Sequence, residues 1–218
     1  MEQVPRHQCL IYDGSPSRQL PALAATLRQK LNQNCRCLFL NTPPMVAGMG
    51  SHLAGLGVDV AREMARGALI LTSDRSHLAH GLFDTERMIS LLSAELTQAL
   101  ADGYSGLWAT GDMTWEFGSE RNFAKLADYE RRLENFFRSN PCLSGVCQYH
   151  VDTLPHEVPR QGLVVHPAFF VNETLSRINP HYLPDTAVDA VGPIGGEIER
   201  ALAQLLAPPR PAARGVRS

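Results

Sequence analysis

The sequence predicts an α/β fold in which a mostly parallel sheet carries helices on both faces. Two observations predict it. Short apolar runs typical of buried strands alternate along the chain with longer segments of helical period. Of the 218 residues, 44% are hydrophobic and 19% are charged, so one continuous core needs no disulfide or metal to hold it.

In the first third of the chain, strands are expected at residues 8–12, 35–40 and 68–72. Ser15 is expected to cap a helix that begins at Pro16, because a hydroxyl satisfies free amide groups there and proline suits the first helical turn. The buried stripe of this helix would consist of Leu20, Leu23, Leu27 and Leu31.

In the middle of the chain, a loop over residues 73–83 is expected to lead into a helix over 84–102. Apolar residues recur there at helical spacing, and Gly103 follows the last of them. A fourth strand is expected at 106–110. Ser119 is then expected to cap another helix, which ends at Asn140 before a proline.

Beyond that helix, strands are expected at 145–150 and 162–166, followed by a short helix near 169–178. From residue 208 onward the composition is rich in proline, alanine and arginine. Such a segment has almost nothing to bury, so a mobile tail is expected over 208–218.

Charge and cysteine content exclude several classes of function. Twenty basic and 22 acidic side chains leave a formal charge of -2, which does not favour direct binding to nucleic acid or to a membrane surface. Because the sequence shows neither a membrane-spanning run nor a secretion signal, we expect a cytoplasmic protein. The five cysteines lie mainly in apolar runs and are expected to be reduced.

The candidate binding residues follow the strands. Ligands of an open parallel sheet bind outside the carboxyl ends of its strands, where helix N-termini and loops meet. The residues that this rule selects as ligand-binding candidates are Asp13, Gly14, Asp112, Met113, Trp115, Glu116, Tyr149, His150 and Asp152, with Ser73, Asp74 and Gly111 also at strand ends.

The sequence does not favour ATP as the ligand. A phosphate-binding loop needs several glycines and a lysine between the first strand and the first helix, whereas residues 13–18 contain one glycine, one proline and no lysine. The only lysines, Lys30 and Lys125, lie away from strand ends. No cofactor is therefore predicted.

Within residues 106–120, two tryptophans and the carboxylates of Asp112 and Glu116 fall around one strand-to-helix turn. Trp108 is expected in the core, whereas Trp115 suits the core and a ligand pocket equally well. Asp112 and Glu116 could form an acid and base pair if burial separated their pKa values. The favoured interpretation is that Asp112 makes an Asx-type turn and Glu116 is solvated.

Metal and nucleophile motifs are weak. Cys147 and His150 should point to opposite faces of one strand, which makes a poor metal clamp. The other metal candidates are His77, His80 and Asp84, which would share a face only if their loop were helical. The sequence has no G-x-S-x-G turn of the kind that carries a hydrolase nucleophile, so we expect neither a metal nor an enzyme.

Six segments together resemble the MEDS domain, the methanogen/methylotroph sensory domain named after a repressor of dichloromethane dehalogenase genes. The likeness runs from about Cys9 to Tyr182, and GLWATGDMTWE and CQYHVDTLP are its most specific parts. The segments are CLIYDG, RCLFLN, GLFDTERM, YERRLENFF, GLWATGDMTWE and CQYHVDTLP.

This resemblance implies a RecA-like, KaiC-like core, of the P-loop NTPase type, that lacks the Walker A motif and senses small, often hydrocarbon-derived molecules. It implies a sensory domain over residues 1–182, with a partly helical extension over 183–207 before the tail. By position, the residues that the family marks fall on Asp13, Asp112, Trp115, Glu116, His150 and Asp152.

We therefore expect a non-enzymatic sensory domain in signal transduction that binds a small molecule at the strand ends. MEDS domains are often joined to a DNA-binding or kinase module, which this sequence does not show. A regulatory partner in trans, with a role in transcription regulation, and a possible homodimer are expected instead. Two alternatives stay open: a nucleotide- or metal-dependent switch or enzyme that uses Asp112, Glu116 and His150, and a protein-interaction module with a vestigial pocket.

Overall fold

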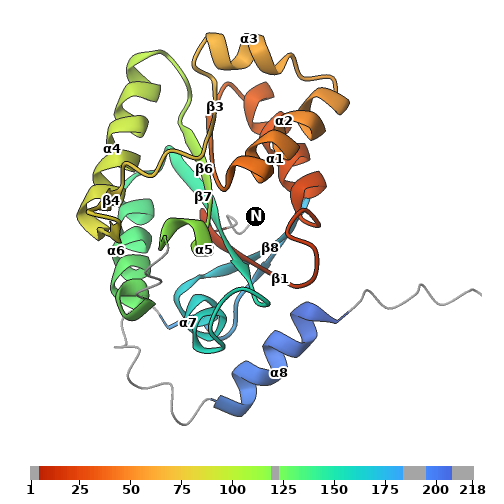
Figure 1. Ribbon diagram of the computed structural model, residues 1–218, viewed down its shortest axis with the longest axis vertical. Helices are drawn as coiled ribbons and strands as arrows, with labels where there is room; N and C mark the ends of the chain where they lie inside the picture. The colour runs from red at the N-terminus through yellow and green to blue at the C-terminus, as the bar shows by residue number, and fades with distance from the viewer. Residues whose placement is uncertain (1–4, 119–122, 184–194, 208–218) are drawn as a thin grey trace, which may run out of the picture.

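The computed structural model describes residues 5–118, 123–183 and 195–207 (Figure 1). Its centre is a seven-stranded sheet with the spatial order β3-β2-β6-β7-β1-β8-β9. Every neighbouring pair is parallel except β8 and β9, so the predicted α/β class with a mostly parallel sheet is confirmed. The strands are β1 (His7–Tyr12), β2 (Arg36–Leu40), β3 (Leu69–Thr72), β6 (Leu107–Asp112), β7 (Leu143–His150), β8 (Ala168–Asn172) and β9 (Leu175–Ile178).

Helices cover both faces of this sheet (Figure 1). In the described part of the chain they are α1 (Leu20–Asn32), α2 (Pro43–Gly55), α3 (Val60–Ala65), α4 (Thr85–Ala101), α5 (Met113–Glu116), α6 (Leu126–Ser139), α7 (Glu157–Val165) and α8 (Gly195–Leu206), with a short 3-10 turn η1 (Phe123–Lys125). None of these helices is long and apolar enough to cross a membrane.

The sheet separates two hydrophobic clusters, because successive residues of a strand point to opposite faces. Leu38 packs in the cluster beneath α4, α6, α7 and α8, whereas its neighbour Phe39 packs in the cluster beneath α1 and α2. Trp108 also lies in the second cluster and is 3% exposed, which confirms its predicted place in the core.

The first helix has the predicted stripe but begins later than predicted. Leu20, Leu23, Leu27 and Leu31 are all buried, yet α1 begins at Leu20 and not at Pro16. The intervening residues form turns, in which the Arg18 amide donates to the Ser15 carbonyl at 2.9 Å. The Ser15 hydroxyl bonds to the hydroxyl of Ser17 at 2.9 Å and therefore does not cap the helix.

The prediction over residues 162–178 was wrong, because helix and strand occur in the opposite order. Residues 162–166 belong largely to α7, and 169–178 form the hairpin of β8 and β9. The valines before His166 favour a strand on propensity, but the apolar side of α7 packs over β7, with Gly162 against the ring of Tyr149. Tertiary packing overrides the local preference here.

The middle of the chain follows the prediction more closely. The helix over 84–102 is confirmed as α4, and Asp84 caps it by accepting the Arg87 amide at 3.1 Å. The preceding loop contains a small hairpin, β4 (Leu78–Ala79) and β5 (Leu82–Phe83), whose turn places His80 and Gly81 at positive φ. Ser119, the predicted cap of the next helix, lies outside the described residues.

Candidate functional site

The carboxyl ends of β6, β7 and β1 lie side by side because these strands are neighbours in the sheet. The chain leaves β1 toward α1 on one face and leaves β6 toward α5 on the other face. Such a divergence is where open α/β sheets bind ligands. Five residues gather there: Tyr12, Gly14, Asp112, His150 and Asp152, which we call the strand-end group.

Tyr12 connects Asp112 and His150 within the strand-end group. Its hydroxyl donates to Oδ2 of Asp112 at 3.4 Å, and its ring stacks on the His150 ring with centroids 4.8 Å apart and planes inclined by 5°. Burial raises the pKa of Asp112 above its ordinary value, although bonds from the Trp115 amide and from Tyr12 oppose the shift. Asp112 is thus a carboxyl group held closer to its neutral form.

The loop after β1 closes the strand-end group. His150 Nε2 donates to the Gly14 carbonyl at 2.8 Å, and the Gly14 amide donates to Oδ2 of Asp152 at 2.7 Å. Asp13 lies beside this loop, but its carboxylate pairs with Arg18 at 2.6 Å on the exposed side. The structure therefore brings together four of the predicted residues and directs the carboxylate of Asp13 elsewhere.

Two buried amide side chains near the strand-end group were missed from the sequence. Gln19 lies beside the Tyr12 hydroxyl and also donates to Oε1 of Gln148 at 3.4 Å. Asn41 directly follows β2, whose last residue is in register with Gly111 of β6. Within the described residues, Gln19 Oε1 and Asn41 Nδ2 are buried without a hydrogen-bond partner. An unpaired acceptor at the start of α1 and an unpaired donor directly after β2 are suited to a polar ligand.

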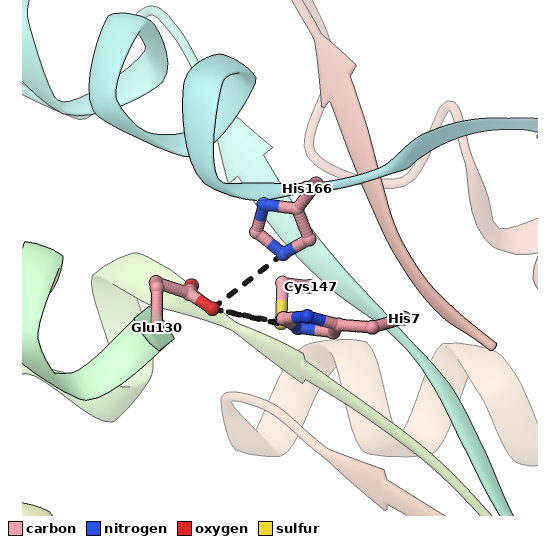
Figure 2. A group of neighbouring side chains, drawn as sticks. All are labelled: His7, Glu130, Cys147 and His166. Atoms are coloured by element: carbon pink, nitrogen blue, oxygen red, sulfur yellow. Dashed lines mark hydrogen bonds and ion pairs between the residues drawn. The ribbon is translucent and has the colours of Figure 1, made fainter. Parts of the chain in front are cut away.

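A second group of functional side chains lies deeper, toward the start of β1 (Figure 2). His7 of β1, Glu130 of α6, Cys147 of β7 and His166 after α7 place one nitrogen, oxygen or sulfur atom each within 4.8 Å of one another. All four are buried, and we call them the buried donor group. The four residues are far apart in the sequence, so no spacing motif predicts that they form a group.

The charges in the buried donor group depend on one another. Burial alone would raise the pKa of Glu130, but His166, His7 and the Tyr149 hydroxyl together bring it below its ordinary value. Burial, reinforced by His7, lowers the pKa of His166 to about 4. For His7, the pull of Glu130 and Glu134 exceeds the effect of burial, and its pKa rises.

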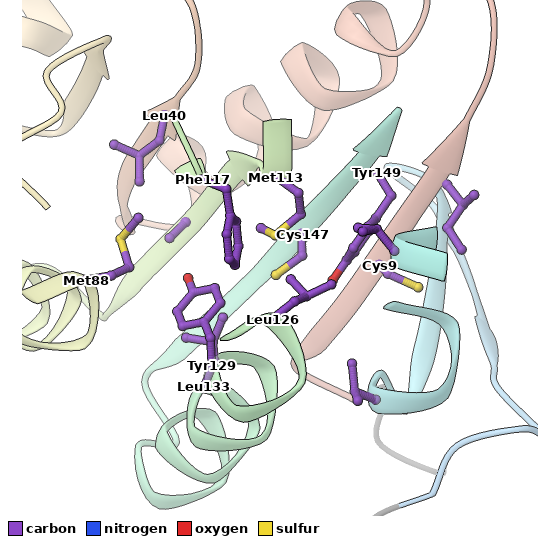
Figure 3. Packing of buried hydrophobic residues seen from close by; sticks show 14 of the residues in the cluster. Cys9, Leu40, Met88, Met113, Phe117, Leu126, Tyr129, Leu133, Cys147 and Tyr149 are labelled. Carbon is purple, nitrogen blue, oxygen red and sulfur yellow. The ribbon is translucent and has the colours of Figure 1, made fainter. Parts of the chain in front are cut away.

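Met113 and Tyr149 point into the core beneath α6 (Figure 3), and Trp115 belongs to the same hydrophobic cluster. Met113, Trp115 and Tyr149 are each at most 1% exposed. Asp112 caps α5 by accepting the Trp115 amide at 2.9 Å, which confirms the predicted Asx-type turn. The Tyr149 hydroxyl donates to Glu130 and so belongs beside the buried donor group.

Glu116 is buried, and the prediction that it is solvated was wrong. Its Oε2 accepts a hydrogen bond from the Tyr129 hydroxyl at 3.0 Å, and its carboxyl fills the space above Gly111. Burial raises the pKa of Glu116 well above its ordinary value. Because Asp112 bonds to Tyr12 and Glu116 to Tyr129, the two carboxyl groups have separate partners.

The three metal candidates near α4 do not share a helical face. His77 is buried and donates from Nε2 to the Glu116 carbonyl at 2.8 Å, and His80 lies in the hairpin turn. Asp84 accepts the Arg87 amide as the cap of α4. The helical turn that would have aligned these ligands is replaced by the hairpin of β4 and β5.

Comparison with protein families identifies the chain. Residues 6–167 match the MEDS family, described as the MEthanogen/methylotroph, DcmR Sensory domain, and the chain therefore belongs to this family. The matched residues include both the strand-end group and the buried donor group. No curated protein matches the chain. Membership implies a sensory or signalling role.

Proposed function

We propose that this MEDS domain senses a small, oxygen-containing molecule that binds at the strand-end group and alters how α5 is held. A short-chain alcohol, aldehyde or carboxylic acid derived from a hydrocarbon has the required chemistry. The signal would pass to a regulatory partner in trans, without turnover of the ligand. A non-enzymatic role is consistent with membership of a sensory family.

The observation that carries this proposal is the pair of unpaired polar atoms, Gln19 Oε1 at the start of α1 and Asn41 Nδ2 directly after β2. Leaving a buried polar group without a partner costs about 1–3 kcal/mol. A ligand that supplies a donor to Gln19 and an acceptor to Asn41 recovers that free energy. Its hydrocarbon part needs only to be small.

The route from ligand to α5 runs through Asp112. One carboxylate oxygen caps α5 through the Trp115 amide, and the other accepts the hydroxyl of Tyr12. Thr114, the second residue of α5, bonds through its hydroxyl to the Thr153 hydroxyl in the loop after β7 at 2.9 Å. A ligand that binds Asp112 competes with Tyr12, so it shifts the population of α5 positions by its differential affinity for them.

The two tryptophans permit a direct test, because they lie on opposite faces of the sheet. A Trp108→Phe variant leaves Trp115 as the fluorophore, and a Trp115→Phe variant leaves Trp108. Each would be titrated with a panel of short-chain alcohols, aldehydes and carboxylic acids, and with ATP and ADP. We expect a ligand to change Trp115 emission and raise the melting temperature, while Trp108 emission stays nearly constant.

The location of the site is tested with two matched substitutions. Tyr12→Phe removes the hydroxyl that bonds to Asp112, whereas Tyr104→Phe removes a hydroxyl that bonds to the Arg66 carbonyl at 2.8 Å, away from the strand-end group. We expect only Tyr12→Phe to change ligand affinity. Equal affinity in both variants would place the ligand elsewhere, and a panel without any binder would count against a sensor of this chemistry.

A further inference from the structure

The four atoms of the buried donor group are spaced like the corners of a metal-binding tetrahedron. His7 Nε2 lies 3.4 Å from Cys147 Sγ and 3.5 Å from Glu130 Oε2. Glu130 Oε2 lies 3.5 Å from His166 Nε2 and 3.7 Å from Cys147 Sγ. Zinc–ligand bonds of about 2.0–2.3 Å place tetrahedral ligand atoms roughly 3.3–3.8 Å apart. Four of the six edges therefore already have the required length.

The hydrogen bonds that the two histidines make also favour a metal ion at this place. His166 Nδ1 donates to the Gly162 carbonyl at 2.7 Å, which leaves a bare lone pair on Nε2. His7 Nδ1 donates to Glu134 Oε2 at 3.0 Å, which likewise leaves a lone pair on its Nε2 when the ring is neutral. The Tyr149 hydroxyl occupies the other oxygen of Glu130. Lone pairs thus converge on one small, buried space.

A proton on His7 does not complete this arrangement. It would satisfy Glu130 or Cys147, but His166 Nε2 is fully buried and has no hydrogen-bond partner in the described part of the chain. That nitrogen points toward Glu130 Oε2 (Figure 2). A cation at the centre would satisfy all four atoms at once.

We propose that His7, Glu130, Cys147 and His166 bind one tetrahedral zinc ion. Two imidazoles, one thiolate and one carboxylate form a donor set that suits zinc, whereas Mg²⁺ and Ca²⁺ prefer oxygen ligands. Both histidines donate their second ring nitrogen to an oxygen, Glu134 for His7 and the Gly162 carbonyl for His166. Such outer bonds orient metal-ligating histidines.

The ion would join four elements. Its ligands come from β1, α6, β7 and the segment that connects α7 to β8. Four protein ligands complete a tetrahedral shell, so the ion would be structural and would stabilise the fold beneath the strand-end group. The zinc site does not depend on the sensory function proposed above, and either can fail without the other.

The first measurement is the zinc content of the full chain, purified from cells grown with added zinc and without chelator. We expect one zinc ion per chain by elemental mass spectrometry. The metal-free chain refolded with one equivalent of Co²⁺ should show the visible bands of tetrahedral cobalt and a thiolate-to-cobalt charge-transfer band. Added Zn²⁺ should abolish both and raise the melting temperature.

Matched variants assign the ligands. Cys147→Ser should remove the charge-transfer band, whereas Cys9→Ser, the adjacent buried cysteine on β1, should retain it. His166→Ala should weaken binding at least 100-fold, whereas His77→Ala removes another buried histidine that bonds to a carbonyl and should bind normally.

Clearly substoichiometric zinc in the folded wild-type chain, with no tetrahedral cobalt spectrum, would overturn the proposal. In that case a buried His7–Glu130 ion pair would account for the group. Retention of the charge-transfer band in Cys147→Ser would also overturn it, because the metal would lie elsewhere. If a variant does not fold, the zinc content and cobalt spectrum of the wild-type chain still decide the matter.

Discussion

The strand-end group lies at the carboxyl ends of β1 and β7, whereas the buried donor group uses His7 at the start of β1 and Cys147 in the middle of β7, and the polar atoms of the two groups are satisfied in different ways. At the strand ends, His150 and Asp152 bond to the backbone of Gly14, in a loop that solvent reaches. In the buried donor group, side chains from four elements place their polar atoms within 4.8 Å of one another. His7 and Tyr12 are about 17 Å apart along β1. Strand β1 thus leads into a solvent-accessible, adaptable loop at its carboxyl end and contributes to a fixed, buried polar group at its amino end.

The largest expected contrast comes from removing one carboxylate in each region. Glu130→Ala removes the acceptor of the Tyr149 hydroxyl and the ion-pair partner of His7 in the core, and should lower the free energy of unfolding by about 3–5 kcal/mol. Asp152→Ala, at a side chain that is 57% exposed, should cost less than about 1 kcal/mol. Urea denaturation measures both, and similar losses would abolish the contrast.

Two glycines sharpen the same comparison. A Cβ on Gly162 would lie 2.5 Å from Cζ of Tyr149, so Gly162→Ala should overpack the core and cost about 1–3 kcal/mol. Gly14 has open space around it but a φ of 75°, so Gly14→Ala should cost about 1–2 kcal/mol through its backbone alone. Zinc content should fall only in the first variant, because Gly162 also holds His166.

Asp112 is expected to stabilise α5 mainly as its helix cap and much less through its negative charge. Asp112→Ala removes the acceptor for the Trp115 amide and should cost about 1 kcal/mol, whereas Asp112→Asn retains an acceptor and should cost much less. Thermal unfolding in the Trp108→Phe background compares the two. Equal losses would mean that the carboxylate charge, and not the cap, stabilises α5.

The last contrast concerns Glu116, where a substitution is expected to stabilise the folded state as pH rises. Because burial raises the folded-state pKa, the neutral carboxyl contributes fully below the unfolded value near 4.5, and this stability is lost as pH rises through the folded pKa. Glu116→Gln keeps an acceptor for Tyr129 and does not ionise. Its stability relative to wild type should rise with pH above about 4.5, by about 1.4 kcal/mol for each pH unit until the folded pKa is reached. A difference that does not vary with pH would contradict a buried, neutral Glu116.

The sequence predicted features that depend on one element or on the order of elements. The alternation of strands and helices indicates the parallel sheet, and the strand-end rule selects Asp112, His150 and Asp152. The α1 stripe and the extent of α4 follow from local spacing. These signals are local, so they survive without knowledge of tertiary contacts.

The features that the sequence did not reveal arise where distant elements pack. Glu116 is buried because Tyr129 arrives from α6, and the valines of α7 are helical because that helix packs over β7. The zinc ligands proposed here come from four elements, and Cys147 was considered only with its sequence neighbour His150. A buried polar residue on each of several apolar elements is the only signal that could have pointed to them.

The central position of β1 in the sheet determines the order in which the strands can pair during synthesis. β1 pairs with β7 and β8, which follow it by more than 130 residues, so it leaves the ribosome long before either partner exists. The parallel ladder of β2, β3 and β6 can assemble earlier, while β1 waits as an unpaired apolar segment. Completion of the sheet is therefore a late, long-range step, and the nascent chain is most exposed to aggregation and chaperone binding until β8 emerges.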